Sequence, residues 1–182
     1  MIILRAVVST CLFFATSVVI ARDAGVSGND VDASIDQRLL DQEVAPIRSR
    51  AELREYLRVM PAQSPLLLLS YSSRERFLNS LVFSENGLAS YSYEDLVAQL
   101  NALDAYKVLS LFGQQATVKL IPGLRQTDGF SQAIMAPADS THLISRGYGP
   151  TASKEPDYPD YACVAKATCG QSMGKICIGA NC

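Results

Sequence analysis

Apolar side chains recur at helical spacing in the middle of the chain. After Ser49 they return every three or four residues, at Leu53, Tyr56, Leu57 and Met60. This period places them on one face of an amphipathic helix. Ser49 and Glu52 have the spacing of a capping box that opens a helix, and Pro61 cannot continue one. The pattern therefore predicts a first helix that begins near residue 50 and ends before Pro61.

The same signals predict three further helices. A second begins at a capping box at residues 72–75 and ends near Gly87, a third follows the cap at residues 92–95, and a fourth runs from Asp104 to Gly113. The apolar run at residues 66–69 fits either a strand or a helix, because periodicity cannot separate the two over four residues.

The pattern becomes less helical after Gly113. Residues 116–121 are β-prone, and turn pairs at 122–123 and 128–129 separate them from residues 131–135, so a small β-hairpin is expected there. From residue 146, glycine and proline interrupt any regular element, and the tripeptide Pro-Asp-Tyr at 156–158 is repeated at 159–161. This composition predicts an extended spacer over residues 146–160.

The first part of the chain has the composition of targeting and flexible segments. Residues 1–21 carry one basic residue, Arg5, then an apolar run that closes on Ala21, as in a cleavable signal peptide. The run is shorter than the roughly 20 apolar residues of a membrane span. Residues 22–47 are polar and contain no aromatic residue, so a flexible leader is expected. Once the signal peptide is removed, no stable membrane span is predicted.

These elements together predict an α+β fold. Residues 48–145 form a predominantly helical core domain with a small β-hairpin, and the spacer at 146–160 leads to a disulfide-stapled C-terminal tail at 161–182. The tail holds four cysteines with the spacing C-x5-C-x7-C-x4-C, at Cys163, Cys169, Cys177 and Cys182.

The chemistry of these cysteines depends on the redox compartment. A signal peptide directs the chain to an oxidising environment, where an even set of cysteines forms disulfides. Four cysteines allow three pairings, which the sequence leaves open. A four-thiolate zinc site is the chemical alternative, but the usual C-x2-C pairs are absent and thiolates must stay reduced to bind metal. Disulfides are therefore favoured, and no metal or cofactor is expected.

One motif suggests catalysis. Residues 170–174 match G-x-S-x-G around Ser172, the serine turn of α/β-hydrolases. That turn requires a strand before it, a helix after it and a histidine further along the chain. The sequence has a single histidine, His142, which precedes the motif. A secreted serine hydrolase that uses Ser172 and His142 is thus an alternative, while a non-enzymatic protein is favoured.

The remaining candidate residues concern recognition. They are a basic row at helical spacing (Arg50, Arg54, Arg58), two tyrosines of the spacer and tail (Tyr158, Tyr161) and two lysines of the tail (Lys166, Lys175). A formal charge of −2 argues against nucleic-acid binding, which requires a concentrated basic surface. The sequence therefore favours an exported (secreted or periplasmic) interaction module that binds a protein or cell-surface component through the cystine loop.

A second function remains open for the tail. Residues 161–182 contain two lysines and no acidic residue, whereas all the acidic residues precede them. This asymmetry is typical of a precursor that releases a cationic disulfide-bonded peptide with antimicrobial or toxin-like activity.

Overall fold

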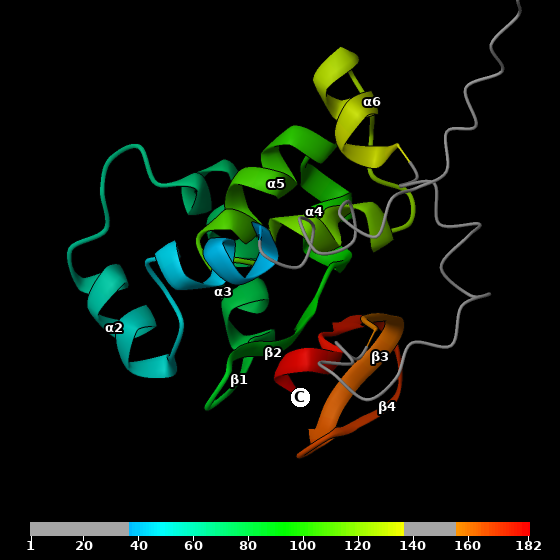
Figure 1. Ribbon diagram of the computed structural model, residues 1–182. Coiled ribbons are helices and arrows are strands. Elements are labelled where there is room, and N and C mark those ends of the chain that lie inside the picture. Colours follow the sequence, from blue (N-terminus) through cyan, green and yellow to red (C-terminus); the bar gives the residue numbers. More distant parts are fainter. Residues whose placement is uncertain (1–36, 137–155) are drawn as a thin grey trace, which may run out of the picture.

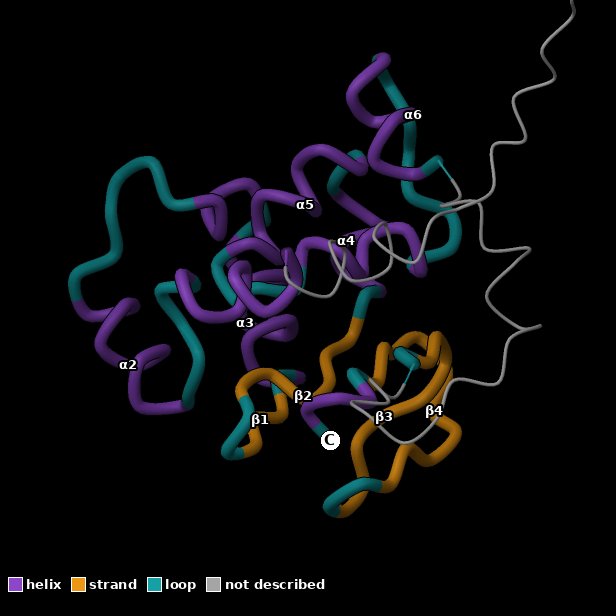
Figure 2. The backbone as a smooth tube through the Cα atoms, viewed as in Figure 1, coloured by secondary structure: helices purple, strands orange, loops and turns teal. Residues whose placement is uncertain are grey.

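The chain folds into helices packed on an antiparallel sheet. The computed structural model describes residues 37–136 and 156–182, and the α+β prediction is confirmed. In Figure 1 the helices occupy the upper and left parts of the molecule and the strands the lower part, a separation that Figure 2 shows by colour. The predicted signal peptide, the expected leader up to residue 36, residues 146–155 of the expected spacer and His142 lie outside the described residues.

Five α-helices and three short 3-10 helices have bounds in the described part of the chain. They are α2 (Arg50–Arg58), η1 (Pro65–Leu68), α3 (Tyr71–Ser80), α4 (Glu94–Gln99), α5 (Ala102–Ser110), η2 (Gln115–Leu120), α6 (Gly129–Met135) and η4 (Gly179–Asn181). The apolar run that fitted a strand or a helix is thus the 3-10 helix η1.

The caps explain where these helices begin. Ser49 caps α2 as predicted: its Oγ accepts a hydrogen bond from the backbone N–H of Glu52 at 3.2 Å. Helix α3 begins two residues earlier than expected, because the cap is Ser70, whose Oγ accepts from the backbone N–H of Ser73. Helix α5 begins after Asn101 rather than at Asp104, since the Asn101 carboxamide oxygen accepts from the backbone N–H of Asp104.

Four strands form one antiparallel sheet. They are β1 (Val82–Ser84), β2 (Gly87–Ser92), β3 (Tyr158–Ala165) and β4 (Thr168–Cys177), and their order in the sheet is β1-β2-β4-β3. Strand β4 pairs with β2 on one side, with Tyr91 opposite Ile176, and with β3 on the other. The predicted tail therefore supplies a central strand of the sheet.

The small hairpin was predicted in the wrong place. Residues 115–120 form η2 and residues 129–135 form α6, where the hairpin was expected. The Asp128 carboxylate accepts from the backbone N–H of Ser131 and opens a helix, so the Asp-Gly pair is a cap rather than a turn. The hairpin near the centre of the chain is β1–β2, which begins at Val82 where the second helix was expected to continue.

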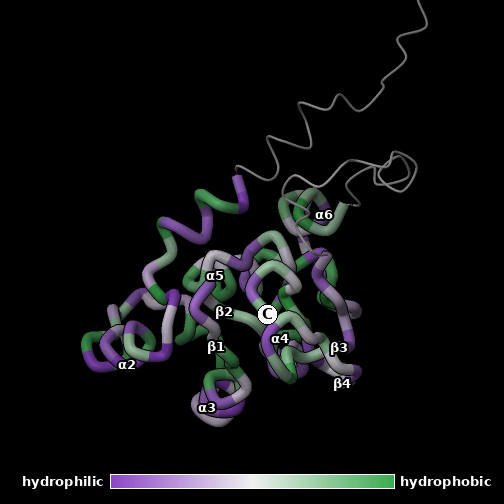
Figure 3. The backbone as a smooth tube through the Cα atoms, turned by 60° about the horizontal axis from the view of Figure 1, so that its bottom comes forward, coloured by the Kyte–Doolittle hydropathy of each residue, from purple (hydrophilic) through white to green (hydrophobic). Residues whose placement is uncertain are grey.

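The core joins the helices to the sheet. Phe77 of α3 makes edge-to-face contacts with Tyr91 of β2 and with Phe112, at ring-centroid distances of 6.3 and 6.1 Å. Ile176 and Ile178 from the tail are fully buried in the same cluster. Helices α2 and α3 carry both hydrophilic and hydrophobic stretches (Figure 3). The disulfide-stapled tail therefore also shares the main core.

The flexible leader was expected to extend to residue 47, and its last part is instead ordered. Residues 37–44 are helical and Ile47 is fully buried, with its backbone N–H donating to Leu111 O at 3.0 Å. Hydrophilic and hydrophobic turns alternate along this helix in Figure 3. Arg38 forms an ion pair of 2.5 Å with Asp157, which lies 119 positions further along the chain. Local composition cannot reveal such a partner.

Across residues 37–136 and 156–182, none of the helices combines the length and the apolar character needed to cross a bilayer.

Candidate functional site

Strands β3 and β4 form a hairpin that two disulfides hold. We call residues 158–177 together with Cys182 the cystine hairpin. Cys163 is bonded to Cys182 and Cys169 to Cys177, with Cα–Cα distances of 5.5 and 5.9 Å. The predicted disulfides are therefore confirmed, and their pairing is defined.

The four sulfur atoms lie close together but do not favour a metal site. The Sγ atoms of Cys169, Cys177 and Cys182 lie within 4.8 Å of one another. They are oxidised in pairs, however, and Cys182 Sγ lies 3.2 Å from Ala165 O and 3.3 Å from Thr168 O. Carbonyl oxygens repel a thiolate, so this surrounding favours disulfide sulfur over the thiolates that bind zinc.

Asp160 fixes the bend of the hairpin. It has a φ of +62°, and its carboxylate accepts hydrogen bonds from Tyr93 OH at 2.6 Å and from the Gly174 backbone N–H at 3.0 Å. Gly174 itself has a φ of +75° and accepts from the Tyr93 backbone N–H through its carbonyl oxygen. The bend in β4 is therefore joined to the segment that links β2 to α4.

These contacts shift two pKa values. The Tyr93 hydroxyl and the Gly174 N–H lower the pKa of the Asp160 carboxyl, because both donate to its ionised form. Burial, followed by the hydrogen bond to Asp160, raises the pKa of Tyr93 to about 12. Asp160 therefore stays ionised and Tyr93 stays neutral across the physiological range.

Asp160→Asn is expected to remove part of the acid sensitivity of the fold. Because the folded-state pKa of Asp160 is lowered, its contribution to stability is present above the unfolded-state pKa of about 3.9 and is lost as pH falls through the folded-state value. Asparagine tolerates a positive φ and keeps an acceptor for the Gly174 N–H, whereas Asp160→Ala loses both features. Urea unfolding measured from pH 7 to pH 3 should give a flatter profile for Asp160→Asn than for the wild type. An unchanged pH slope would contradict this role of the carboxylate.

The bend also brings two tyrosines together. Residues an odd number apart along a regular strand point to opposite faces. The extra residue at Asp160 shifts the register, so the rings of Tyr158 and Tyr161 contact each other with centroids 5.7 Å apart. Both are exposed, at 38% and 37%, as are Val164 at 65% and Met173 at 72%. The cystine hairpin therefore presents four large apolar side chains to solvent.

The repeated Pro-Asp-Tyr tripeptide is an anchor rather than a spacer. Strand β3 begins at Tyr158, so the last residues of the expected spacer belong to the sheet. The first aspartate of the repeat, Asp157, binds Arg38, and the second, Asp160, binds Tyr93 and Gly174. Sequence reasoning missed both aspartates, although the repeat itself was a signal that could have indicated paired roles.

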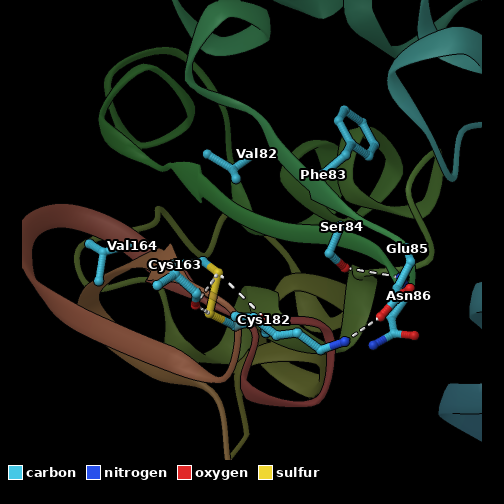
Figure 4. A pocket seen from close by; sticks show the side chains of 10 residues that line it. Val82, Phe83, Ser84, Glu85, Asn86, Cys163, Val164 and Cys182 are labelled. Atoms are coloured by element: carbon cyan, nitrogen blue, oxygen red, sulfur yellow. Dashed lines mark hydrogen bonds and ion pairs between the residues drawn. A yellow bond between two sulfur atoms is a disulfide. The ribbon is translucent and has the colours of Figure 1, made fainter.

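A cleft separates the cystine hairpin from the β1–β2 turn. It has a volume of about 480 Å³, and Val82, Val164 and the Cys163–Cys182 disulfide lie along it (Figure 4). Lys166 Nζ binds Glu85 Oε1 at 2.8 Å across the cleft, and this pairing raises the pKa of Lys166 and lowers that of Glu85. Lys175, the other predicted lysine, lies in β4 opposite Ser92 and is half-buried.

The three arginines of the predicted basic row on α2 make different contacts. Arg50 donates to Leu78 O and Leu81 O and lies over the Phe83 ring at 5.4 Å, so it fastens the end of α3. Arg58 forms an exposed ion pair with Glu55 at 2.6 Å, and Arg54 is exposed. Helix α2 also lies on the opposite side of the molecule from the cystine hairpin (Figure 1).

Ser172 does not occupy a serine-hydrolase turn. It lies within strand β4, which continues to Cys177 and is followed by η4 rather than by an α-helix. The strand–turn–helix arrangement that exposes a hydrolase serine is therefore missing around Ser172, and the proposed partner His142 lies outside the described residues.

Compared with protein-family models, curated proteins and solved structures, the chain matches none. Its function must therefore be inferred from its own residues and their geometry.

Proposed function

We propose that this chain is an exported, non-enzymatic interaction module that binds a protein or surface component through its cystine hairpin. The observation that carries the proposal is the exposure of Tyr158, Tyr161, Val164 and Met173 on one short element that is covalently held. Large apolar and aromatic side chains held in place lose little conformational entropy on binding, and tyrosine is enriched at interface hot spots.

The signal-peptide pattern and the disulfides support export. Disulfides form and persist in oxidising compartments, which a chain with a cleaved signal peptide reaches. The hairpin depends on this oxidation, because both of its strands carry cystine sulfurs.

The position of β4 argues against the release of the tail as a cationic peptide. Strand β4 lies between β2 and β3, and Ile176 and Ile178 belong to the core. Cutting the tail away would open the sheet and expose both isoleucines, so an intact chain is the better supported form.

Tyr161→Ala/Val164→Asp is expected to weaken binding at least tenfold, because it removes one aromatic contact and places a charge in the apolar surface. The test measures saturable binding of the purified, oxidised chain to intact cells of the producing organism and to its exported proteins. Val59→Asp is the matched control: Val59 is 57% exposed but lies at the end of α2. Equal binding by the hairpin variant and the control, or no saturable binding by the wild type, would contradict the proposal.

A further inference from the structure

The two disulfides of the cystine hairpin lie against each other. Cys182 Sγ, bonded to Cys163, lies within 4.8 Å of both sulfurs of the other disulfide, Cys169 and Cys177. Thiol–disulfide exchange proceeds by direct attack of a thiolate on a disulfide sulfur. We propose that the cystine hairpin is a thiol-triggered switch, in which the pairs Cys163–Cys182 and Cys169–Cys177 rearrange to Cys163–Cys169 and Cys177–Cys182.

The outer disulfide is the point of entry. Cys163 and Cys182 line the cleft of about 480 Å³ between the hairpin and the β1–β2 turn (Figure 4). Neither sulfur of the other disulfide lines this cleft, and Cys177 is fully buried. A small thiol such as glutathione therefore reaches the Cys163–Cys182 bond first.

The first step breaks that bond. The thiolate of the small thiol attacks Cys163 Sγ, forms a mixed disulfide with Cys163 and expels Cys182 as a thiolate. The carbonyl oxygens of Ala165 and Thr168, 3.2 and 3.3 Å from Cys182 Sγ, destabilise this negative charge. The first step is therefore slow, and the Cys182 thiolate reacts onward rather than accumulating.

The second step uses the neighbouring disulfide. The Cys182 thiolate attacks Cys177 Sγ, forms Cys177–Cys182 and expels Cys169 as a thiolate. Cys169 is the better leaving group because it is partly exposed, whereas burial disfavours a thiolate at Cys177.

The third step closes the cycle. The Cys169 thiolate attacks Cys163 Sγ in the mixed disulfide, forms Cys163–Cys169 and returns the small thiol as a thiolate. Cys163 and Cys169 are direct partners in the β3–β4 register, and paired antiparallel residues have the Cα separation that a disulfide needs. Two disulfides are present before and after, so the thiol acts as a catalyst and no net oxidation or reduction occurs.

The rearrangement would remove the covalent ties that join the arms of the hairpin to Cys182 and to the buried Cys177. At present Cys163 is tied to Cys182, next to η4, and the η4 region is fastened to β2 by Asn181 Nδ2 donating to Leu88 O at 2.9 Å. Cys169 is tied to the buried Cys177. After exchange, Cys163–Cys169 joins the two arms of the hairpin only to each other. The switch would therefore loosen the surface that carries Tyr161 and Val164, and as a regulator of binding it rests on the function proposed above.

Trypsin digestion distinguishes the two pairings. Cleavage after Lys166 and Lys175 places Cys163, Cys169 and the pair Cys177 and Cys182 on three different peptides. The present pairing holds all three peptides in one species. The switched pairing gives a two-peptide species and a separate peptide, beginning at Ile176, with an internal disulfide.

The experiment incubates the purified, oxidised chain with substoichiometric glutathione, blocks free thiols with N-ethylmaleimide, and analyses the non-reduced digest by mass spectrometry. The two-peptide species should increase with time while the total disulfide content stays constant. Its absence at all times would overturn the proposal, whether or not glutathione adducts form.

A control variant isolates the second step. In Cys169→Ala/Cys177→Ala the Cys182 thiolate has no disulfide to attack, so a glutathione adduct at Cys163 should accumulate severalfold above the wild-type level. Equal adduct levels would also overturn the switch. Neither measurement uses a binding partner, so the binding test of Tyr161→Ala/Val164→Asp decides the proposed function separately. If the switched protein bound as tightly as the native one, the regulatory role would be overturned while the function proposed above would stand.

Discussion

Asp157→Ala is expected to lower the free energy of unfolding by about 3–5 kcal/mol, the usual cost of breaking a buried ion pair from one side. The Asp157 carboxylate lies 2.5 Å from the Arg38 guanidinium, and the two side chains are only 4% and 18% exposed. Without the carboxylate, the positive charge of Arg38 stays where water solvates it poorly. The pair joins the helix at residues 37–44 to the start of β3. Its loss should therefore loosen both of these segments.

Urea unfolding of the oxidised chain, followed by circular dichroism, measures this cost. Asp104→Ala is the matched control, since Asp104 pairs with Lys107 at 2.9 Å with side chains that are 25% and 48% exposed. Such a pair contributes at most about 1 kcal/mol. Arg38→Met/Asp157→Leu should recover most of the stability, because it removes both charges together. If Asp157→Ala cost no more than Asp104→Ala, the ion pair would not hold the helix.

The elements that the sequence predicted well are those whose signals are local. The cap at Ser49, the acidic residues in the first turn of α4 and Gly113, three residues after the last residue of α5, each act within a few residues of the helix end that they mark. Most of the helical core could therefore be located without knowing its neighbours. The errors in helix starts, at Ser70 and Asn101, arise because several polar residues near a helix start are competent caps.

The elements that the sequence did not predict are stabilised by residues far away along the chain. Strand β4 is central because Tyr91 and Ile176, 85 positions apart, face each other across the sheet. The helix at residues 37–44 is held by Asp157 and by contact with the chain near Gly113. In both cases the local composition is polar or rich in small residues, and only tertiary packing compensates for the ordering entropy.

The sequence predicted that the candidate site contains disulfides, but it did not predict their pairing. Clustered cysteines behind a predicted signal peptide indicated disulfides, and the structure has them. Their pairing follows from the register of β3 and β4 and from the turn that brings Cys182 back to Cys163, neither of which the spacing specifies. The tyrosines share a face because Asp160 adopts a positive φ, which requires its two hydrogen-bond donors to be in place.

Gly113→Ala is expected to lower the free energy of unfolding by about 2–5 kcal/mol. Gly113 has a φ of +65°, a conformation that costs a residue with a side chain about 1–2 kcal/mol. An added Cβ would also lie 2.6 Å from Gln42 Cα and 2.7 Å from Asp41 O, and such overpacking costs about 1–3 kcal/mol more. These atoms belong to the backbone of the helix at residues 37–44, so they cannot move aside as a side chain could.

Urea unfolding and tryptic cleavage after Arg38 both report on this variant. Cleavage should accelerate in Gly113→Ala because the helix leaves its position. Gly129→Ala is the control: no atom lies within 4 Å of its added Cβ, and alanine should stabilise the first turn of α6 by about 0.5–1 kcal/mol. Unchanged cleavage after Arg38 would show that the helix tolerates the added methyl group.

The two large effects should not be additive, because both act on the same helix. If Gly113→Ala displaces residues 37–44, Arg38 leaves with them and Asp157 loses that ion pair. Adding Asp157→Ala should then cost far less than the same change in the wild type, with a coupling energy of about 1–3 kcal/mol. Additive costs would mean that Arg38 still pairs with Asp157 in the glycine variant, and that the clash at Gln42 is absorbed without undocking the helix.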